Sequence, residues 1–427
     1  MDSECLIGTP ESVTQPTSFQ TGRQPGVGDP ALWYGRPVPR GSRTSVGAIG
    51  LMFFANGASF ANWLPRVDEV RDAIGVGNGG LGLALLGGGL GGILGSIVGG
   101  RVLRAGLILR VLRWSMTGLA LTLPFIAFVP NAFTLLLLLT VLGFSDVLAD
   151  ASMNAEAAAI QATTDGSIMH RIHAMWSFGF VVGTMIGWCA SVLDIPLKVQ
   201  LIVVAVVLLT ISTRSVAKLD AAHIPEQATN ESRSSSTKVT RAVLVIVFFA
   251  LAAAAFEVTP NEWSAAALRD WLDAGRLKGA GPVVFSAAML VGRLSGDRVI
   301  DRIGELRLLA LSLASIITGY AVLMLAPNAV VGLVAFALWG LGVSVMFPQI
   351  YLMAARMNPE RPGTGLAAMT LAQRIGFMTA TSSMGALSAS VGYGGAFTTI
   401  VGVAGVLWVA GLAASANHAS TTIAGAS

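Results

Sequence analysis

The sequence predicts an all-α polytopic membrane protein with twelve transmembrane helices arranged in two halves of six. Of its 427 residues, 54% are hydrophobic and only 12% are charged, and the mean hydropathy is +0.70. A soluble domain of this length cannot bury so much apolar surface, because its interior grows slowly with chain length. Apolar runs of about 20 residues, enough to span a bilayer as a helix, recur along the chain. Short motifs in the first half also reappear in the second.

The composition excludes a soluble enzyme, a disordered chain and a secreted disulfide scaffold. The net charge is +4 and the basic residues form no block, so we expect no nucleic-acid partner. Cys5 and Cys189 lie in a polar tail and an apolar run, and the four histidines show no metal-ligand spacing. We therefore expect no metal, no cofactor and no catalytic residue.

The apolar runs define the predicted domains. Residues 1–44 are rich in proline and glycine and are expected to form a disordered cytoplasmic tail. The first half covers 45–213 and the second 242–415, joined by a charged, serine-rich cytoplasmic linker at 214–241 and followed by a tail at 416–427. The predicted spans are 45–64, 79–100, 110–130, 132–157, 172–193, 197–213, 242–264, 281–297, 306–326, 329–354, 364–390 and 394–415.

The distribution of Lys and Arg predicts the orientation. With both termini in the cytoplasm, the inner segments carry 19 Lys and Arg and the outer loops carry 6, while Arg293 and Arg374 fall within spans. Cytoplasmic loops of membrane proteins are enriched in these residues. We expect a multi-pass protein of the plasma (inner) membrane, in contact with the lipid bilayer and monomeric.

Glycine is concentrated in span two, where 11 of the 22 residues from Gly79 to Gly100 are glycine. A phosphate-binding loop would need a preceding strand and a suitably placed lysine, and the sequence has neither. The glycines, and those at 179, 183 and 187 in span five, are instead expected to allow close helix packing.

The two halves repeat motifs at equivalent places. Asn62-Trp63 at the end of span one matches Asn261-Glu262-Trp263 at the end of span seven, and Trp176-Ser177 matches Gln373-Arg374. The basic turn after span two matches the turn at 297–304 after span eight. Parallel repeats of six spans are typical of transporters that rock around a central site.

The turn Asp301-Arg302-Ile303-Gly304-Glu305-Leu306-Arg307 resembles the signature loop of the major facilitator superfamily. The resemblance covers about 45–415, and further stretches resemble the fucose-permease-like branch of sugar–proton symporters and its bacterial relatives. These stretches are Asn62-Trp63 with Arg66, 150–154, His173 with Trp176-Ser177, Glu257 with 262–265, and 292–294. The first-half loop has Leu103-Arg104 where the signature has an aspartate, and span one lacks the carboxylate that the fucose permease has there.

Carboxylates inside the spans are candidate coupling groups, because an acid within hydrocarbon is costly and is commonly functional. Asp146, Asp150 and Asn154 lie on one face of span four, spaced four residues apart. Two carboxylates this close are costly to ionise together, which suits a proton carrier. Glu257 lies in span seven shortly before Pro260, where a proline-broken helix could line a cavity. Pairing with Arg293 or Arg374 is the structural alternative for Glu257.

Several other polar and aromatic residues are candidates for binding a solute. They are Asn62, Asn154, His173, Trp176, Trp263, Gln349, Gln373 and Arg374. Helix packing accounts equally well for the amides and the arginine, and His173 could be a hydrogen-bonded core residue. The tryptophans at 63 and 263 could be interfacial anchors, and Glu262 is predicted to be interfacial and solvated.

Two cytoplasmic turns are predicted to form a gate. The first contributes Arg101 and Arg104, and the second contributes Asp301, Arg302, Gly304 and Arg307. Opposite charges could pair across the halves when this side is closed. Because the first turn carries only positive charge, we expect the gate to depend mainly on Asp301.

These patterns predict a secondary transporter that moves a small polar solute with protons by alternating access. An efflux antiporter for drugs or metabolites is one alternative, and a non-transporting receptor on the same fold is another. Proton movement across vesicles on addition of candidate solutes would separate the three.

Overall fold

The computed structural model describes residues 43–104, 107–162, 169–219, 241–356 and 362–424 as helices and short connections. The long first-half helices are α1 (Arg43–Ala61), α3 (Asn78–Arg104), α4 (Ile108–Thr122), α5 (Ala132–Ala162), α6 (Met169–Val192) and α7 (Leu197–Val216). Between α1 and α3 lie the 3-10 turn η2 (Leu64–Arg66) and the short helix α2 (Val67–Ala73), and α4 continues into η3 (Leu123–Phe128). Pro65 and Pro124 stand in the first turns of η2 and η3, where a missing N–H costs no hydrogen bond.

The second half consists of α8 (Arg241–Asp270), η5 (Gly275–Leu277), α9 (Ala280–Ile303), α10 (Glu305–Met324), α11 (Ala329–Val343), α12 (Met346–Arg356) and α13 (Pro362–Ala424). The span predicted at 329–354 is thus two helices, α11 and α12. The last two predicted spans correspond to the two helical parts of α13, which meet at a kink at Gly392, where the non-helical φ of 73° is accessible to glycine. α13 also continues to Ala424, through the range predicted as a tail from 416. The predicted tail at 1–44 and most of the linker at 214–241 lie outside the described residues.

Nine stretches of the described chain are long and apolar enough to cross a membrane. One of them, Ala368–Ala413, has 46 residues, which is twice the length that a bilayer requires. The shorter apolar stretch Ala280–Gly296 and helix α1 complete the set of spans that the sequence predicts. The all-helical membrane fold is therefore confirmed.

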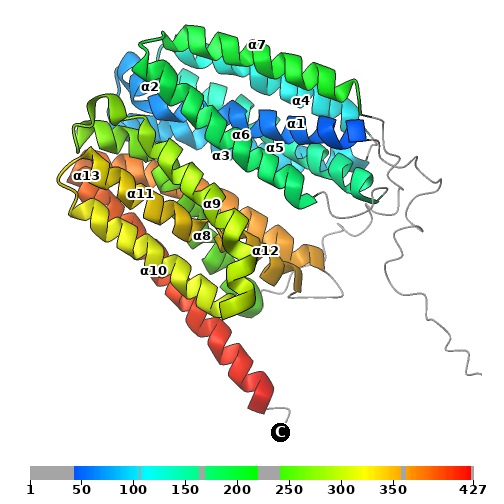
Figure 1. The fold of residues 1–427 in the computed structure, drawn as a ribbon, viewed down its shortest axis with the longest axis vertical. Coiled ribbons are helices and arrows are strands. Elements are labelled where there is room, and N and C mark those ends of the chain that lie inside the picture. The colour runs from blue at the N-terminus through cyan, green and yellow to red at the C-terminus, as the bar shows by residue number, and fades with distance from the viewer. Residues whose placement is uncertain (1–42, 105–106, 163–168, 220–240, 357–361, 425–427) are drawn as a thin grey trace, which may run out of the picture.

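The two halves lie side by side with their helices running along the same direction (Figure 1). Within the halves, α1 packs against α6, α3 against α5 and α8 against α13. Between the halves, α3 packs against α13 and α6 packs against α9. These contacts use the second and fifth spans of each half, so the interface follows the internal repeat.

Glycines allow the backbones of neighbouring helices to approach closely, as the sequence predicted. A Cβ atom at Gly91 of α3 would strike the carbonyl oxygen of Thr140 in α5, and one at Gly143 would strike that of Gly88. In the same way, Gly179 of α6 lies against the backbone of α1 at Phe54. A larger residue at any of these positions would force two helices apart.

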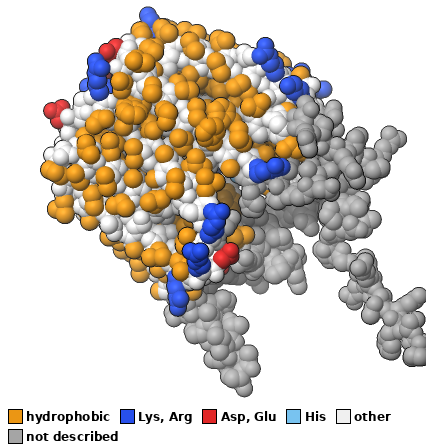
Figure 2. Space-filling model, in the orientation of Figure 1, with side chains coloured by type: hydrophobic (Ala, Val, Ile, Leu, Met, Phe, Trp, Pro, Cys, Tyr) orange, Lys and Arg blue, Asp and Glu red, His pale blue; other side chains and the backbone are white. Residues whose placement is uncertain are grey.

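The outer surface of the helices is predominantly apolar. Figure 2 shows hydrophobic side chains over the middle of one face and Lys and Arg near its edges. Exposed residues on this surface include Trp114, Phe133, Val206 and Val406, each more than half exposed. A continuous apolar exterior of this kind would be unstable in water and is suited to lipid.

Candidate functional site

A cavity of about 210 Å³ lies between the two halves. Residues of α1, α3, α5 and α6 line it on one side, and residues of α8 and α13 on the other. Its polar and charged lining residues are Asp146, Trp176, Glu257, Asn261, Glu262, Arg374 and Thr381. The cavity therefore collects polar groups from spans that are otherwise apolar, at the interface predicted for a solute.

Asn56 organises the first-half wall of the cavity. Its amide nitrogen donates to Oδ1 of Asp146 at 2.9 Å, and its amide oxygen accepts from Nε1 of Trp176 at 2.9 Å. This buried asparagine thereby joins α1, α5 and α6 and orients both the carboxylate and the indole. The sequence interpretation did not select Asn56, although an amide in the middle of an apolar span was a usable signal.

Asp150 and Asn154 lie one and two turns further along α5 and do not line this cavity. Nδ2 of Asn154 donates to Oδ1 of Asp150 at 3.0 Å. Arg374 of α13 is within electrostatic reach of both Asp146 and Asp150. The face predicted on span four is thus present, and only Asp146 meets the cavity.

Glu257 and Arg293 connect the second half of the molecule to the first. Nη2 of Arg293 in α9 lies 3.8 Å from Oε2 of Glu257 in α8. Nη1 of the same guanidinium donates to Oγ of Ser177 in α6 at 3.1 Å. A change of charge at Glu257 would therefore act directly on a side chain that bridges the halves.

Glu262 is buried and lines the cavity, so the prediction of an interfacial, solvated residue was wrong. Its side chain is 9% exposed, and its Oε2 accepts from Oγ1 of Thr381 in α13 at 2.6 Å. Pro260 is accommodated within α8, which continues to Asp270 and carries Glu262 inward. The helix extends beyond the predicted end of span seven at 264, which is why the residue lies deeper than expected.

The structure places the remaining predicted binding residues outside this lining. Asn62 is fully buried and its backbone and side-chain oxygens accept from Gln200 of α7. His173 is exposed, with its ring edge-on to Phe53, so it is not a core residue. Gln373 accepts a hydrogen bond from the Tyr351 hydroxyl at 3.3 Å, and Gln349 is buried.

Trp63 and Trp263 are both completely buried. An interfacial anchor keeps its ring at the membrane surface, so neither tryptophan has that role. Trp63 lies between α1 and η2, and Trp263 lies within α8.

The predicted gating residues lie at the opposite end of the helices from α2. Arg101 and Arg104 belong to the last turn of α3, and their side chains lie outside the described part of the structure. Asp301, Arg302 and Arg307 are exposed, and Gly304 joins α9 to α10 with a φ of 81°. Among the described residues, Asp301 makes no ion pair.

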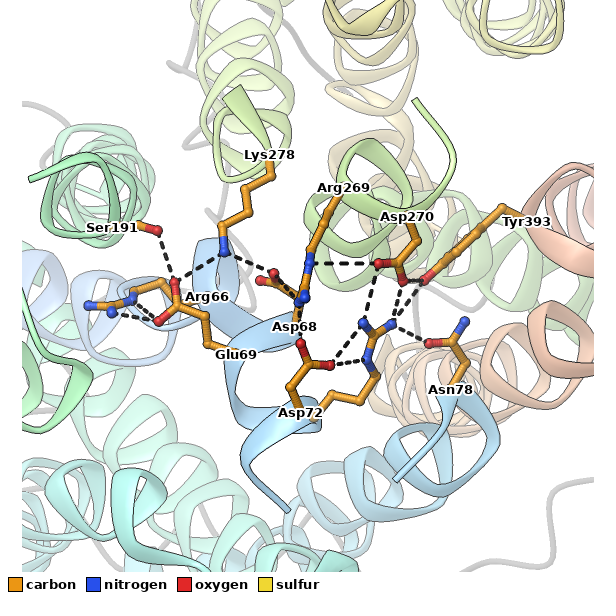
Figure 3. A network of polar contacts seen from close by, with 11 residues as sticks. Arg66, Asp68, Glu69, Asp72, Asn78, Ser191, Arg269, Asp270, Lys278 and Tyr393 are labelled. Atoms are coloured by element: carbon orange, nitrogen blue, oxygen red, sulfur yellow. Dashed lines mark hydrogen bonds and ion pairs between the residues drawn. The ribbon is translucent and has the colours of Figure 1, made fainter. Parts of the chain in front are cut away.

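Charged residues of η2 and α2 form a network with the second half (Figure 3). Asp68 is fully buried, and its Oδ2 accepts from Arg269 at 2.9 Å and from Lys278 at 3.0 Å. Arg71 contacts Asp270 at 2.5 Å, and the hydroxyl of Tyr393 donates to the same carboxylate at 3.0 Å. The α2 end of the interface is therefore closed by contacts between the halves.

Glu69 extends this network to Arg66 and Ser191 of the first half. Its carboxylate accepts from Arg66 at 2.5 Å and from Ser191 at 2.9 Å, and lies 3.3 Å from Nζ of Lys278. Burial alone would raise the pKa of Glu69, but the hydrogen bond from Arg66 and the charges of Arg66 and Lys278 outweigh it and lower the pKa. Glu69 is thus held as the anion that the network requires.

The sequence interpretation counted Arg71, Arg269 and Lys278 only for orientation, and it noted Arg66 in addition as part of the family resemblance. The available signal was the density of opposite charges in two equivalent loops, 66–72 after span one and 269–278 after span seven. Complementary charges in equivalent loops of a repeat could have suggested a contact between them.

Comparisons with known proteins agree with this architecture. The family model of the Major Facilitator Superfamily matches residues 46–381. The uncharacterized transporter y4wD of Sinorhizobium fredii is 26% identical over 328 residues, 75% of this chain and 84% of that protein. The membrane protein MosC of Rhizobium meliloti is 27% identical over 367 residues, 85% of this chain and 88% of that protein.

A similar solved structure is that of the nucleoside transporter NupG, with a TM-score of 0.70 and 16% sequence identity. The superposition covers 87% of this chain and 98% of NupG. At this identity the likeness establishes the fold alone. The match of the family model over most of the chain, on a helical fold with a cavity between repeated halves, establishes that the chain belongs to the major facilitator superfamily of membrane transporters.

Proposed function

We propose that the protein is a secondary transporter that moves a small polar solute together with protons, by alternating access to the cavity between its halves. The observation that carries this proposal is the cavity itself, lined by Asp146, Glu257 and Glu262 and bounded by both halves. Carboxylates at such a position are costly to keep unless they carry charge or protons during the cycle.

The closed α2 end supports the alternating-access part of the proposal. The Lys and Arg distribution predicts that this end faces the outside of the cell, and with that orientation the structure is a state closed to the outside. Opening it requires the contacts of Arg71 with Asp270 and of Asp68 with Arg269 to part. The rocking of one half against the other would do this.

The coupling part is supported by the arrangement around Glu257. Its carboxylate faces Arg293, which also holds Ser177 of the other half. A proton on Glu257 would weaken the ion pair and free the guanidinium. We therefore assign Glu257 and Asp146 to proton coupling, with Asp150 as a supporting acid next to Asp146.

The test is solute-driven proton movement in proteoliposomes that contain a pH-sensitive dye. The first solutes to examine are nucleosides, because a structural neighbour is a nucleoside transporter, followed by neutral and charged sugars. Asp146→Asn and Glu257→Gln should abolish proton movement, while the exposed loop variant Asp273→Asn should not. Equal proton movement in wild type and both acid variants would refute proton coupling through these residues.

Efflux of amphipathic compounds is a second candidate, because apolar side chains occupy much of the lining. These include Phe60, Leu85, Phe180, Phe377 and Met378. Proton-driven extrusion of apolar dyes from inside-out vesicles, without any response to polar solutes, would favour this alternative.

A further inference from the structure

We propose that the cavity selects an organic cation, a solute that carries an ammonium or similar positively charged group. This inference rests on the proposed function, and it adds the chemical class of the solute. Three independent features of the lining carry it: its unused hydrogen-bond acceptors, its charge and its aromatic side chains.

The hydrogen-bond donors of the lining are largely occupied. The Trp176 indole donates to Asn56, the Thr381 hydroxyl to Glu262, and the Asn261 amide nitrogen to the backbone oxygen of Glu257. Arg374 is the exception, since its Nε is buried and has no hydrogen-bond partner among the described residues. Apart from the guanidinium of Arg374, a solute in this cavity thus finds few donors to accept from.

Acceptors, in contrast, remain available. Asn261 is 7% exposed, and its Oδ1 has no hydrogen-bond partner within the described chain. The same is true of Oε2 of Glu257, whose nearest cation is 3.8 Å away. Buried polar atoms are normally hydrogen-bonded, so unpaired acceptors in a transport cavity indicate a ligand that supplies donors.

The charges of the cavity also favour a cation. Three carboxylates, at 146, 257 and 262, line it with a single guanidinium, Arg374. Arg293 pairs with Glu257 but does not itself line the cavity. Arg374 is within electrostatic reach of both Asp146 and Asp150. Glu262 is left with the neutral donor Thr381 and no ion pair among the described residues. When Asp150 is counted with the three lining carboxylates, four acids face two arginines. The acids therefore outnumber the arginines even when one acid carries the proton of the proposed cycle.

Aromatic rings line the same cavity. Trp176 and Phe180 lie 5.5 Å apart between ring centroids, and Phe60 and Phe377 also line the cavity. Because the indole nitrogen of Trp176 is engaged by Asn56, its ring is fixed. Aromatic faces attract cations and pack against the apolar parts of an organic solute, and they give no comparable advantage to an anion.

The test measures the charge preference of the cavity without needing the physiological solute. Cys5 and Cys189 are replaced by serine, and Met378→Cys introduces a reporter thiol in the lining. The thiol is labelled with two methanethiosulfonates of similar size, one bearing a trimethylammonium group and one a sulfonate. Each rate is divided by the rate of the same reagent with a free thiol in solution.

We expect the normalised rate of the cationic reagent to exceed that of the anionic reagent about ten-fold or more. Glu262→Gln should lower this ratio several-fold, whereas Arg374→Gln should raise it. Phe377→Cys provides a second reporter in case the first variant does not fold. A ratio of one or less in the folded reporter protein would overturn the inference.

The outcome is separable from that of the proposed function, because labelling requires neither transport nor a proton gradient. A high ratio combined with absent proton movement would refute coupling and leave the solute class supported. Proton movement driven by neutral or anionic solutes, combined with a ratio near one, would support transport and refute selection of a cation.

Discussion

Arg71 of α2 and Asp270 at the end of α8 form an ion pair, with Nη1 2.5 Å from Oδ2, that joins the two halves of the protein. The two residues are 199 positions apart in the sequence. Tyr393, directly after the bend of α13 at Gly392, donates to the same carboxylate. This cluster therefore links α2 of the first half to the end of α8 and to the kink of α13 in the second half.

Asp270→Asn should shift the protein away from the state closed at the α2 end. The variant removes the charge that faces Arg71, which is largely buried, and a hydrogen bond to a charged group contributes about 1.5–3 kcal/mol. The measurement is labelling of a cysteine in the cavity by a membrane-impermeant reagent added from outside. Arg276→Gln is the control, because its pair with Asp194 is 3.8 Å long and highly exposed. Equal labelling of the two variants would show that Arg71 and Asp270 do not hold this end closed.

Acidification should weaken the closed end through Glu69. The pKa of this carboxyl is lowered from its ordinary value of 4.5, so its contribution is present above that value and is lost as the pH falls through the lowered pKa. Wild type should therefore melt at a higher temperature than Glu69→Gln at pH 7, and the difference should shrink below about pH 4.5. A difference that is constant from neutral to acidic pH would contradict this assignment.

Gly91→Ala should destabilise the first half by about 1–3 kcal/mol, the usual cost of overpacking. The added methyl group would contact the Thr140 carbonyl oxygen of α5, and a backbone atom has little freedom to move. Gly405→Ala is the matched control, since nothing lies within 4 Å of its added Cβ. Thermal unfolding in detergent gives both values, and a loss at Gly405 as large as that at Gly91 would exclude a packing cause.

Asp301→Asn should increase the population that is open to the cytoplasm and slow turnover without preventing solute binding. Asp301 is exposed at the end opposite α2, as expected for a gate that pairs only when that end closes. An exposed pair contributes only about 0–1 kcal/mol, so the shift should be at most about five-fold. Cysteine labelling of the cavity from the cytoplasmic side measures it. No gain in accessibility would remove Asp301 from the gate.

The fold was predictable because hydropathy and repeats are local signals. Each span carries its own run of apolar residues, and the glycine-rich α3 already indicated close packing. The acids at 146 and 257 were recognisable for the same reason, since a charge within a span stands out from its neighbours.

The rest of the site depends on contacts between residues distant in sequence. Asn56 gains its role from Asp146 and Trp176, which lie 90 and 120 positions away. Asp68 is fully buried and pairs with Arg269 and Lys278 of the other half. The opposite charges of 66–72 and 269–278 could suggest a contact between these segments, but which carboxylate is buried follows only from the arrangement of the halves.

The ion pairs at the α2 end differ in their exposure to water, and they should therefore differ in their response to salt. Added electrolyte screens pairs that water can reach, such as Arg276 with Asp194, and acts much less on a buried carboxylate such as Asp68. If the α2 end faces outward, as the Lys and Arg distribution predicts, a change in external salinity would weaken the exposed pairs of the closed state and leave the buried ones intact. The resting conformation should then persist across a wide range of environmental salt concentrations.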